Sequence, residues 1–192
     1  MIKWVKILPR MAVHSLANND FYAPSVLNSF PANDGIRLVS LNGSGEEFLT
    51  EEQIQNLREK YGFTAVHSYQ FDDIGGEIWE SIVRRKNIDR STFIEIDDST
   101  AEHIRDNVLA PYDPIDHCEM ADELLVVHCH AGISRSSAVG LSLAYHLGLK
   151  SSEVRDMNPN IDPNKFILAK MLKALGHSEV GFNMWRNSRS RF

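Results

Sequence analysis

Residues 124–136 have the sequence LLVVHCHAGISRS, and this stretch decides how the rest of the chain can fold. Its first four residues are apolar and two of them are valines, which indicates a strand buried on both faces. Apolar residues then recur at helical spacing up to a glycine that is a typical helix stop: Val139, Leu143, Leu147 and Gly148. The stretch therefore predicts a buried strand, a turn and a helix over 136–147, with Cys129 at the end of the strand and Arg135 at the start of the helix.

A turn between a strand and a helix N-terminus is a natural anion site, because backbone N–H groups and the positive end of the helix dipole converge on one point. The same positive end favours the thiolate form of Cys129, which is the form that a nucleophile needs. Arg135 can hold two oxygens of a phosphoryl group through its planar guanidinium. His128 can hydrogen-bond the turn and orient the thiolate, and Ser136 can donate a hydrogen bond to the sulfur. The turn thus predicts a phosphoryl site beside a nucleophilic cysteine.

The pattern of Cys129, five residues, Arg135 and Ser136, preceded by His128, resembles the signature loop of the cysteine-based protein tyrosine and dual-specificity phosphatases. A weaker likeness, in the order of strand and helix signals, extends over residues 36–176. The resemblance implies an α/β fold, a phosphocysteine intermediate, and no cofactor or metal. It also implies which residues bind phosphate: His130, Ala131, Gly132, Ile133, Ser134 and Arg135.

Phosphate-ester cleavage also needs a positioned acid to protonate the leaving oxygen, and in the resembled families this acid is an aspartate on a mobile loop upstream. The segment Phe71-Asp72-Asp73-Ile74-Gly75 resembles the Trp-Pro-Asp-x-Gly loop of tyrosine phosphatases and the Phe-Asp-Asp-Ile segment of small bacterial and phage phosphatase-like proteins. The segment 94–99 resembles the corresponding loop of dual-specificity phosphatases, and its sequence distance to Cys129 suits that family better. We prefer Asp73 as the acid, because Asp98 can simply stabilise a helix N-terminus beside Ser99. Asp98 remains the alternative.

Strand and helix signals alternate along the chain. Strands are predicted at 2–8, 35–41, 63–71, 92–96 and 124–128. Helices are predicted around 12–16, 50–61, 78–82, 99–109, 136–147 and 162–175, with capping boxes at Thr50/Gln53 and Ser99/Glu102. The alternation predicts an α/β fold with a central, mostly parallel twisted sheet, helices on both faces, and strand 124–128 in a central position. Ligands in such folds bind at the carboxyl ends of the strands, where Cys129 lies.

The composition is that of an ordinary globular protein, with 192 residues, 43% hydrophobic and 24% charged. This length suits one catalytic domain over residues 1–176, followed by a C-terminal tail over 177–192. A net charge of −6 argues against nucleic-acid or anionic-membrane binding. No apolar run is long enough for a transmembrane helix, and the N-terminus is too polar for a secretory signal. Two cysteines cannot make a disulfide framework, so we expect a cytoplasmic protein. We also expect it to be a monomer.

Other interpretations compete for some of these residues. His117-Cys118 and His128-Cys129-His130 could supply zinc ligands, but Cys129 cannot both bind zinc and attack phosphorus. Cys118 could form a disulfide with an oxidised Cys129, although most spare cysteines are small core or loop residues.

Three classes of function follow from the motif. The leading prediction is a phosphatase of phosphotyrosine, and also of phosphoserine and phosphothreonine, so that the partner is a phosphorylated protein or peptide. A second class hydrolyses a non-protein phosphate ester such as a phosphoinositide or an RNA 5′ end, although phosphoinositide enzymes usually have lysines in the loop and residues 130–134 contain none. The third class is a non-catalytic phospho-binding module, whose usual mark is a lost Cys or Arg.

Overall fold

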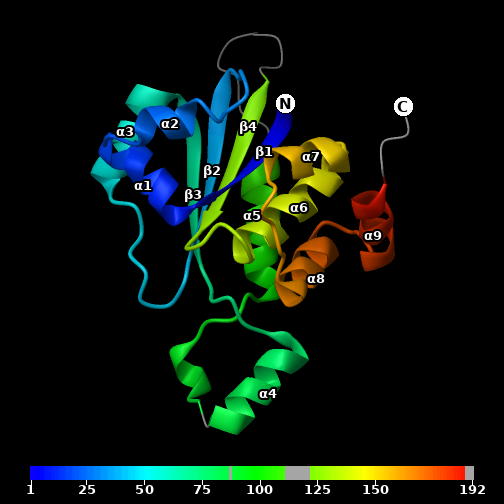
Figure 1. Ribbon diagram of the computed structural model, residues 1–192. Helices are drawn as coiled ribbons and strands as arrows, with labels where there is room; N and C mark the ends of the chain where they lie inside the picture. The colour runs from blue at the N-terminus through cyan, green and yellow to red at the C-terminus, as the bar shows by residue number, and fades with distance from the viewer. Residues whose placement is uncertain (87, 111–121, 189–192) are drawn as a thin grey trace.

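The computed structural model of the chain describes residues 1–86, 88–110 and 122–188 (Figure 1). Four strands form its central sheet: β1 (Ile2–Pro9), β2 (Gly35–Asn42), β3 (Phe63–Gln70) and β4 (Glu123–Cys129). Their order across the sheet is β1-β4-β2-β3, and each neighbouring pair is parallel. The predicted α/β fold with a central parallel sheet is confirmed.

Strand β4 lies between β1 and β2, and all of its residues are buried. Leu125 is paired with Val5 of β1 on one side and with Arg37 of β2 on the other. A run of apolar residues without polar alternation is what a strand covered on both faces requires. The central position expected for residues 124–128 is therefore confirmed.

Helices cover both faces of this sheet (Figure 1). One face carries α1 (Arg10–Asn18), α2 (Ala23–Leu27) and α3 (Glu51–Tyr61). The other carries α5 (Asp98–Leu109), α6 (Arg135–His146), α7 (Ser151–Met157), α8 (Lys165–Ala174) and α9 (Glu179–Asn187). A hydrophobic core lies on each face of the sheet, and alternate residues of β4 pack into each of them. Leu124 and Val126 lie in the core on the first face, and Leu125 and Val127 lie in the core on the second. Within the described ranges, no helix is long and apolar enough to cross a membrane.

The strand predicted over residues 92–96 is wrong. A short 3-10 helix (Arg90–Thr92) precedes an extended segment that lies outside the sheet. This segment exchanges hydrogen bonds with Asp72, whose backbone N–H donates to the carbonyl of Ile94 at 2.7 Å and whose carboxylate accepts from the N–H of Ile94 at 2.8 Å. Both hydrogen bonds are between the same two residues, Asp72 and Ile94, so they do not form a β-ladder. The β-branched residues of this segment therefore have no neighbouring strand to pair with.

Two helix starts differ by two residues from their predicted positions. Asp97, and not Ser99, caps α5, because its side chain accepts a hydrogen bond from the N–H of Thr100 at 2.7 Å. Asn164 caps α8 by accepting from the N–H groups of Phe166 and Ile167. Asp97 lies two residues before the predicted cap of its helix, and Asn164 lies two residues after the predicted start of its own, but both side chains reach the free N–H groups of the first turn.

Residues Glu179–Asn187, expected to belong to a C-terminal tail, form helix α9 and pack on the domain. Phe182 is only 1% exposed, and the ring of Trp185 lies 5.6 Å from that of Tyr145. The indole N–H of Trp185 donates to the carbonyl of Leu149 at 2.7 Å. Phe182 and Trp185 form the buried face of α9 and are three positions apart, as expected for one face of a helix. Polar neighbours such as Arg186 make this spacing hard to recognise in the sequence.

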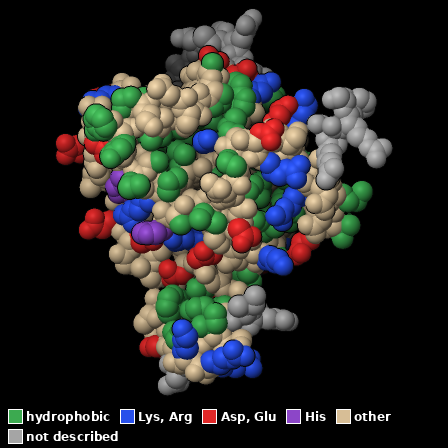
Figure 2. Space-filling model, in the orientation of Figure 1, with side chains coloured by type: hydrophobic (Ala, Val, Ile, Leu, Met, Phe, Trp, Pro, Cys, Tyr) green, Lys and Arg blue, Asp and Glu red, His purple; other side chains and the backbone are tan. Residues whose placement is uncertain are grey.

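Helix α4 (Gly76–Lys86) and the 3-10 helix form a lobe, residues 76–86 and 88–97, that stands apart from the other helices (Figure 1). The rings of Trp79 and Phe93 pack edge to face inside it, with centroids 5.1 Å apart. Basic side chains gather at its far end (Figure 2), where α4 ends with Arg84, Arg85 and Lys86. The lobe extends from the edge of the molecule at which the strands end, so it lies on the same side as Cys129.

Candidate active site

The turn 130–134 joins the end of β4 to the start of α6. Gly132 has a φ of +72°, and a Cβ at this position would lie 2.5 Å from the backbone N of Pro9. Only glycine can therefore occupy it, because both the left-handed backbone and the close approach to β1 exclude a side chain. The N–H of Arg10 also donates to the carbonyl of His130 at 3.1 Å. The end of β1 thus holds the turn in a tight, defined shape.

The backbone amides of the turn are available to an anion. In the part of the chain that the structure describes, the N–H groups of Ala131 to Ser134 donate to no protein acceptor. They lie at the N-terminus of α6, whose first-turn amides also lack intrahelical partners. Adjacent free amides and a helix dipole together favour a bound anion.

Cys129 and Ser136 are in contact beneath this turn. The Sγ of Cys129 lies 3.1 Å from the Oγ of Ser136, within hydrogen-bond distance for sulfur, and both side chains are buried, at 3% and 0% exposed. The hydroxyl can donate to a thiolate and so stabilise negative charge on sulfur.

His128 is fully buried one residue before the cysteine. Burial lowers its pKa to about 3, the positive charges of His14 and Arg10 act in the same direction, and the backbone of Cys129 acts weakly in the opposite one. The imidazole is therefore neutral at physiological pH. Among the described residues neither ring nitrogen has a hydrogen-bond partner, so the bond to the turn predicted for His128 is not formed.

Arg135 is 5% exposed and is held by two acceptors from distant parts of the chain. Its Nη1 donates to the carbonyl of Phe71 at 2.9 Å, and its Nη2 donates to Oε1 of Glu46 at 3.3 Å. These contacts direct the guanidinium to the carboxyl edge of the sheet, where β3 ends and the loop after β2 returns.

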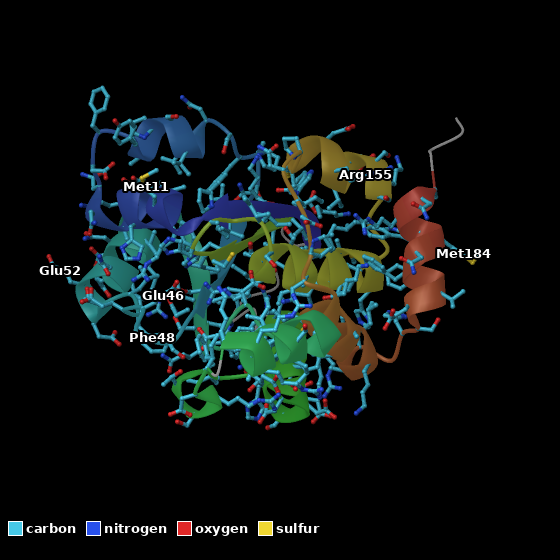
Figure 3. The ribbon with its side chains drawn as sticks, turned by 60° about the horizontal axis from the view of Figure 1, so that its bottom comes forward. Met11, Glu46, Phe48, Glu52, Arg155 and Met184 are labelled. Atoms are coloured by element: carbon cyan, nitrogen blue, oxygen red, sulfur yellow. The ribbon has the colours of Figure 1, made fainter. Side chains whose placement is uncertain are left out.

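Glu46 is a site residue that the sequence gives no reason to select. It lies on the loop 43–50 between β2 and α3 (Figure 3), and accepts a hydrogen bond from the N–H of Gly43 at 2.6 Å. Besides Arg135, its carboxylate faces His130 at 3.4 Å and Arg10 at 3.8 Å. Burial would raise the pKa of Glu46, but the hydrogen bond from Gly43 and the charges of Arg135 and Arg10 outweigh burial and lower it. The side chain of Glu46 is thus held as a carboxylate beside the guanidinium of Arg135.

Asp73, the preferred acid, lies against the turn. Its Oδ1 accepts hydrogen bonds from the Oγ of Ser134 and from the Nδ2 of Asn164, both at 2.8 Å. The chain bends sharply after it, because Gly75 has a φ of +114° and a Cβ there would lie 2.3 Å from the ring of Phe166. Close packing on α8 therefore brings the Asp73 carboxylate to residues 61 positions away in sequence.

Asp72 anchors the segment that carries Asp73. Its carboxylate accepts from the N–H of Ser44 at 2.8 Å, from the Oγ of Ser44 at 2.5 Å and from the N–H of Ile94 at 2.8 Å. Burial would raise the pKa of Asp72, but these hydrogen bonds and the charge of Arg135 lower it. It links the loop after β2 to the base of the lobe as a structural carboxylate.

Asp98, the alternative acid, has different partners. It lies in the first turn of α5, where its carboxylate binds Lys170 at 2.7 Å and Lys173. These two hydrogen-bonded lysines lower the pKa of Asp98 to about 2. Its contacts thus join α5 to α8, and none of them is with the turn 130–134.

Two of the possible zinc ligands lie outside the residues that the structure describes. His117 and Cys118 lie outside them, so neither a zinc ligand set nor a disulfide with Cys118 can be placed. Within the described ranges, no group of three or more His, Cys, Asp and Glu side chains is arranged to hold a metal ion.

Comparisons with known proteins return no relative. No family model matches the chain, and neither does any curated protein or solved structure.

Proposed function

We propose that this chain is a cysteine-dependent phosphatase that hydrolyses phosphotyrosine in proteins or peptides, with phosphoserine and phosphothreonine as further substrates. One observation carries the proposal, the meeting of three groups at the turn 130–134. The buried thiol of Cys129 comes just before the turn and contacts Ser136, and the carboxylate of Asp73 is bonded to Ser134 in the turn. The guanidinium of Arg135 contacts Glu46, which in turn faces His130 of the turn. These groups are a nucleophile, an anion clamp and an acid, which phosphate-monoester cleavage requires.

In the first step the thiolate of Cys129 attacks phosphorus. A sulfur–phosphorus bond forms, the ester P–O bond breaks, and Asp73 gives its proton to the leaving oxygen. The turn amides and Arg135 bind the three equatorial oxygens, over which charge spreads in the transition state.

In the second step water attacks the phosphocysteine. Asp73, now a carboxylate, takes the proton from water while the sulfur–phosphorus bond breaks and inorganic phosphate leaves. The hydroxyl of Ser136 stabilises the departing thiolate, from which it lies 3.1 Å in the free protein. No step needs a cofactor.

Asp73 is proposed as the acid in place of Asp98 for two reasons. Both carboxylate oxygens of Asp98 are bound by lysines, which lower its pKa and hold it between α5 and α8. A general acid must have a carboxyl oxygen that can reach the leaving oxygen. Of the two aspartates, Asp73 is hydrogen-bonded to Ser134 in the turn, whereas Asp98 is bonded to Lys170 and Lys173.

The test is hydrolysis of aryl phosphates and of phosphopeptides by the parent and Cys129→Ser, with an acid quench to trap the intermediate. We expect a phosphocysteine in the parent, loss of turnover in the variant, and no effect of metal chelators. Turnover by the variant within about tenfold of the parent would refute covalent catalysis.

A panel of phosphotyrosine, phosphoserine and phosphothreonine peptides, an inositol phosphate and a 5′-phosphorylated RNA identifies the substrate class. Preference for either of the last two would overturn the protein-phosphatase proposal. Tight phosphopeptide binding by the parent without turnover would identify a non-catalytic module.

A further inference from the structure

Asn164 lies where the acid segment, the turn and helix α8 meet. Its Nδ2 donates to Oδ1 of Asp73 at 2.8 Å, and its backbone N–H donates to the carbonyl of Ser134 at 3.4 Å. Its Oδ1 accepts from the N–H groups of Phe166 at 2.9 Å and Ile167 at 3.2 Å. One side chain therefore links the proposed acid to the N-terminus of a helix.

The helix cap decides which way the amide of Asn164 faces. Phe166 and Ile167 offer backbone N–H donors, so the atom that faces them must be the amide oxygen. The NH₂ group, which can only donate, then has to face Asp73. This assignment rests on the hydrogen-bond network and leaves no second orientation of the amide.

The two oxygens of Asp73 are consequently not equivalent. Oδ1 accepts from both Asn164 and Ser134, while Oδ2 has no hydrogen-bond partner among the described residues. A carboxyl oxygen that already accepts two hydrogen bonds is a poor place for the acidic proton. The proton of a neutral Asp73 is therefore on Oδ2, the oxygen free to face a leaving group.

We propose that Asn164 is a positioning residue that anchors Oδ1 of Asp73, so that Oδ2 alone gives the proton in the first step and takes it back from water in the second. The inference rests on the proposed phosphatase function, and adds to it a fixed choice of oxygen and an anchor on a helix. Helix α8 is a rigid support, since Ile167 and Met171 are fully buried in the core. A loop carboxylate held by a packed helix keeps its geometry better than one held by the loop alone.

Asn164→Asp separates the two roles of this side chain. Aspartate caps a helix as well as asparagine does, so the bonds to Phe166 and Ile167 are kept. It has no NH₂ group to donate to Asp73 and places a like charge there. We expect kcat for phenyl phosphate, a poor leaving group, to fall about 10–10²-fold, as expected for a displaced catalytic group. KM should stay within about twofold, and kcat for an activated dinitrophenyl ester should fall less than about threefold.

Asp97→Ala is the matched control for a lost helix cap. Asp97 caps α5 through a bond to Thr100, at 2.7 Å, and is not part of the proposed chemistry. This variant should lower the melting temperature and leave the ratio of kcat on the two esters unchanged. Asn164→Ala, which loses both cap and donor, should combine the lower melting temperature with the loss of kcat on phenyl phosphate. Equal losses on both esters in Asn164→Asp would overturn the proposal and leave Asn164 as a cap.

Combining Asn164→Asp with Asp73→Asn distinguishes the failure of this inference from that of the proposed acid. If Asn164 acts through Asp73, adding Asn164→Asp to Asp73→Asn should change kcat less than about twofold. An undiminished effect in that background would overturn the inference while the acid stands. If Asp73→Asn itself shows no dependence on the leaving group, the acid assignment is wrong and the inference falls with it.

Discussion

Replacing Glu46 with glutamine should lower the free energy of unfolding by about 2 kcal/mol and tighten the binding of inorganic phosphate about tenfold. The two effects have one cause. Glu46 is the carboxylate that neutralises Arg135 in the free protein, and phosphate is the anion proposed to replace or join it. Without phosphate, Glu46→Gln should be less stable than the parent, and added phosphate should therefore raise its stability by more than it raises that of the parent.

The magnitude follows from the exposure of the two side chains, which are 7% exposed for Arg135 and 20% for Glu46. Breaking a fully buried ion pair costs about 3–5 kcal/mol, and a hydrogen bond to a charged group contributes about 1.5–3 kcal/mol. Water can reach Glu46, and Arg135 keeps its bond to Phe71, so the lower range applies. A loss of about 2 kcal/mol corresponds to a melting temperature lower by about 4–8 °C.

The pH dependence of this loss has a definite sign. The pKa of Glu46 is lowered in the folded protein, so its contribution to stability is fully present above the unfolded pKa and disappears as pH falls through the folded pKa. The difference between parent and Glu46→Gln should therefore be largest near pH 7 and shrink in acid.

Urea unfolding followed by the fluorescence of the three tryptophans measures the stability, and thermal unfolding at increasing phosphate measures the binding. Glu52→Gln is the control, because Glu52 is an exposed glutamate on α3 (Figure 3) and should change stability by less than about 1 kcal/mol. Equal stability of Glu46→Gln and the parent at pH 7, or weaker phosphate binding by the variant, would refute the reasoning.

Three further predictions concern other parts of the structure. Arg135→Lys keeps the charge but loses the planar fork, so kcat/KM for an aryl phosphate should fall about 10²-fold or more; near-normal kinetics would make the arginine structural. Asp98→Asn removes the carboxylate that binds Lys170 and Lys173, and should lower stability at pH 7 without changing kcat. Because the pKa of Asp98 is lowered to about 2, the difference in stability should vanish as pH falls through that value, which acid titration of both proteins checks. Phe182→Ala should destabilise the protein by about 3 kcal/mol, since the ring is buried beneath α9; a loss below about 1 kcal/mol in urea unfolding would mean that α9 is not part of the cooperative unit.

The strand, turn and helix around Cys129 could be predicted because each has a local cause. The four apolar residues before His128 suit only a strand covered on both faces, and helical spacing after Ser136 suits only a helix. The order of such segments then favours a parallel sheet, since parallel neighbours need a crossover between them. Short-range signals of this kind do not depend on where the rest of the chain lies.

The partners of the charged side chains were decided by tertiary structure alone. Asp73 and Asp98 both follow plausible loop motifs, and their difference arises from residues far along the chain. Asp73 meets Asn164, 91 positions away, while Asp98 meets Lys170, 72 positions away. Glu46 likewise meets Arg135 across 89 positions. A carboxylate has the same local propensity in each of these places, so its role depends on which distant groups the packing of α8 and the loops brings within hydrogen-bond distance.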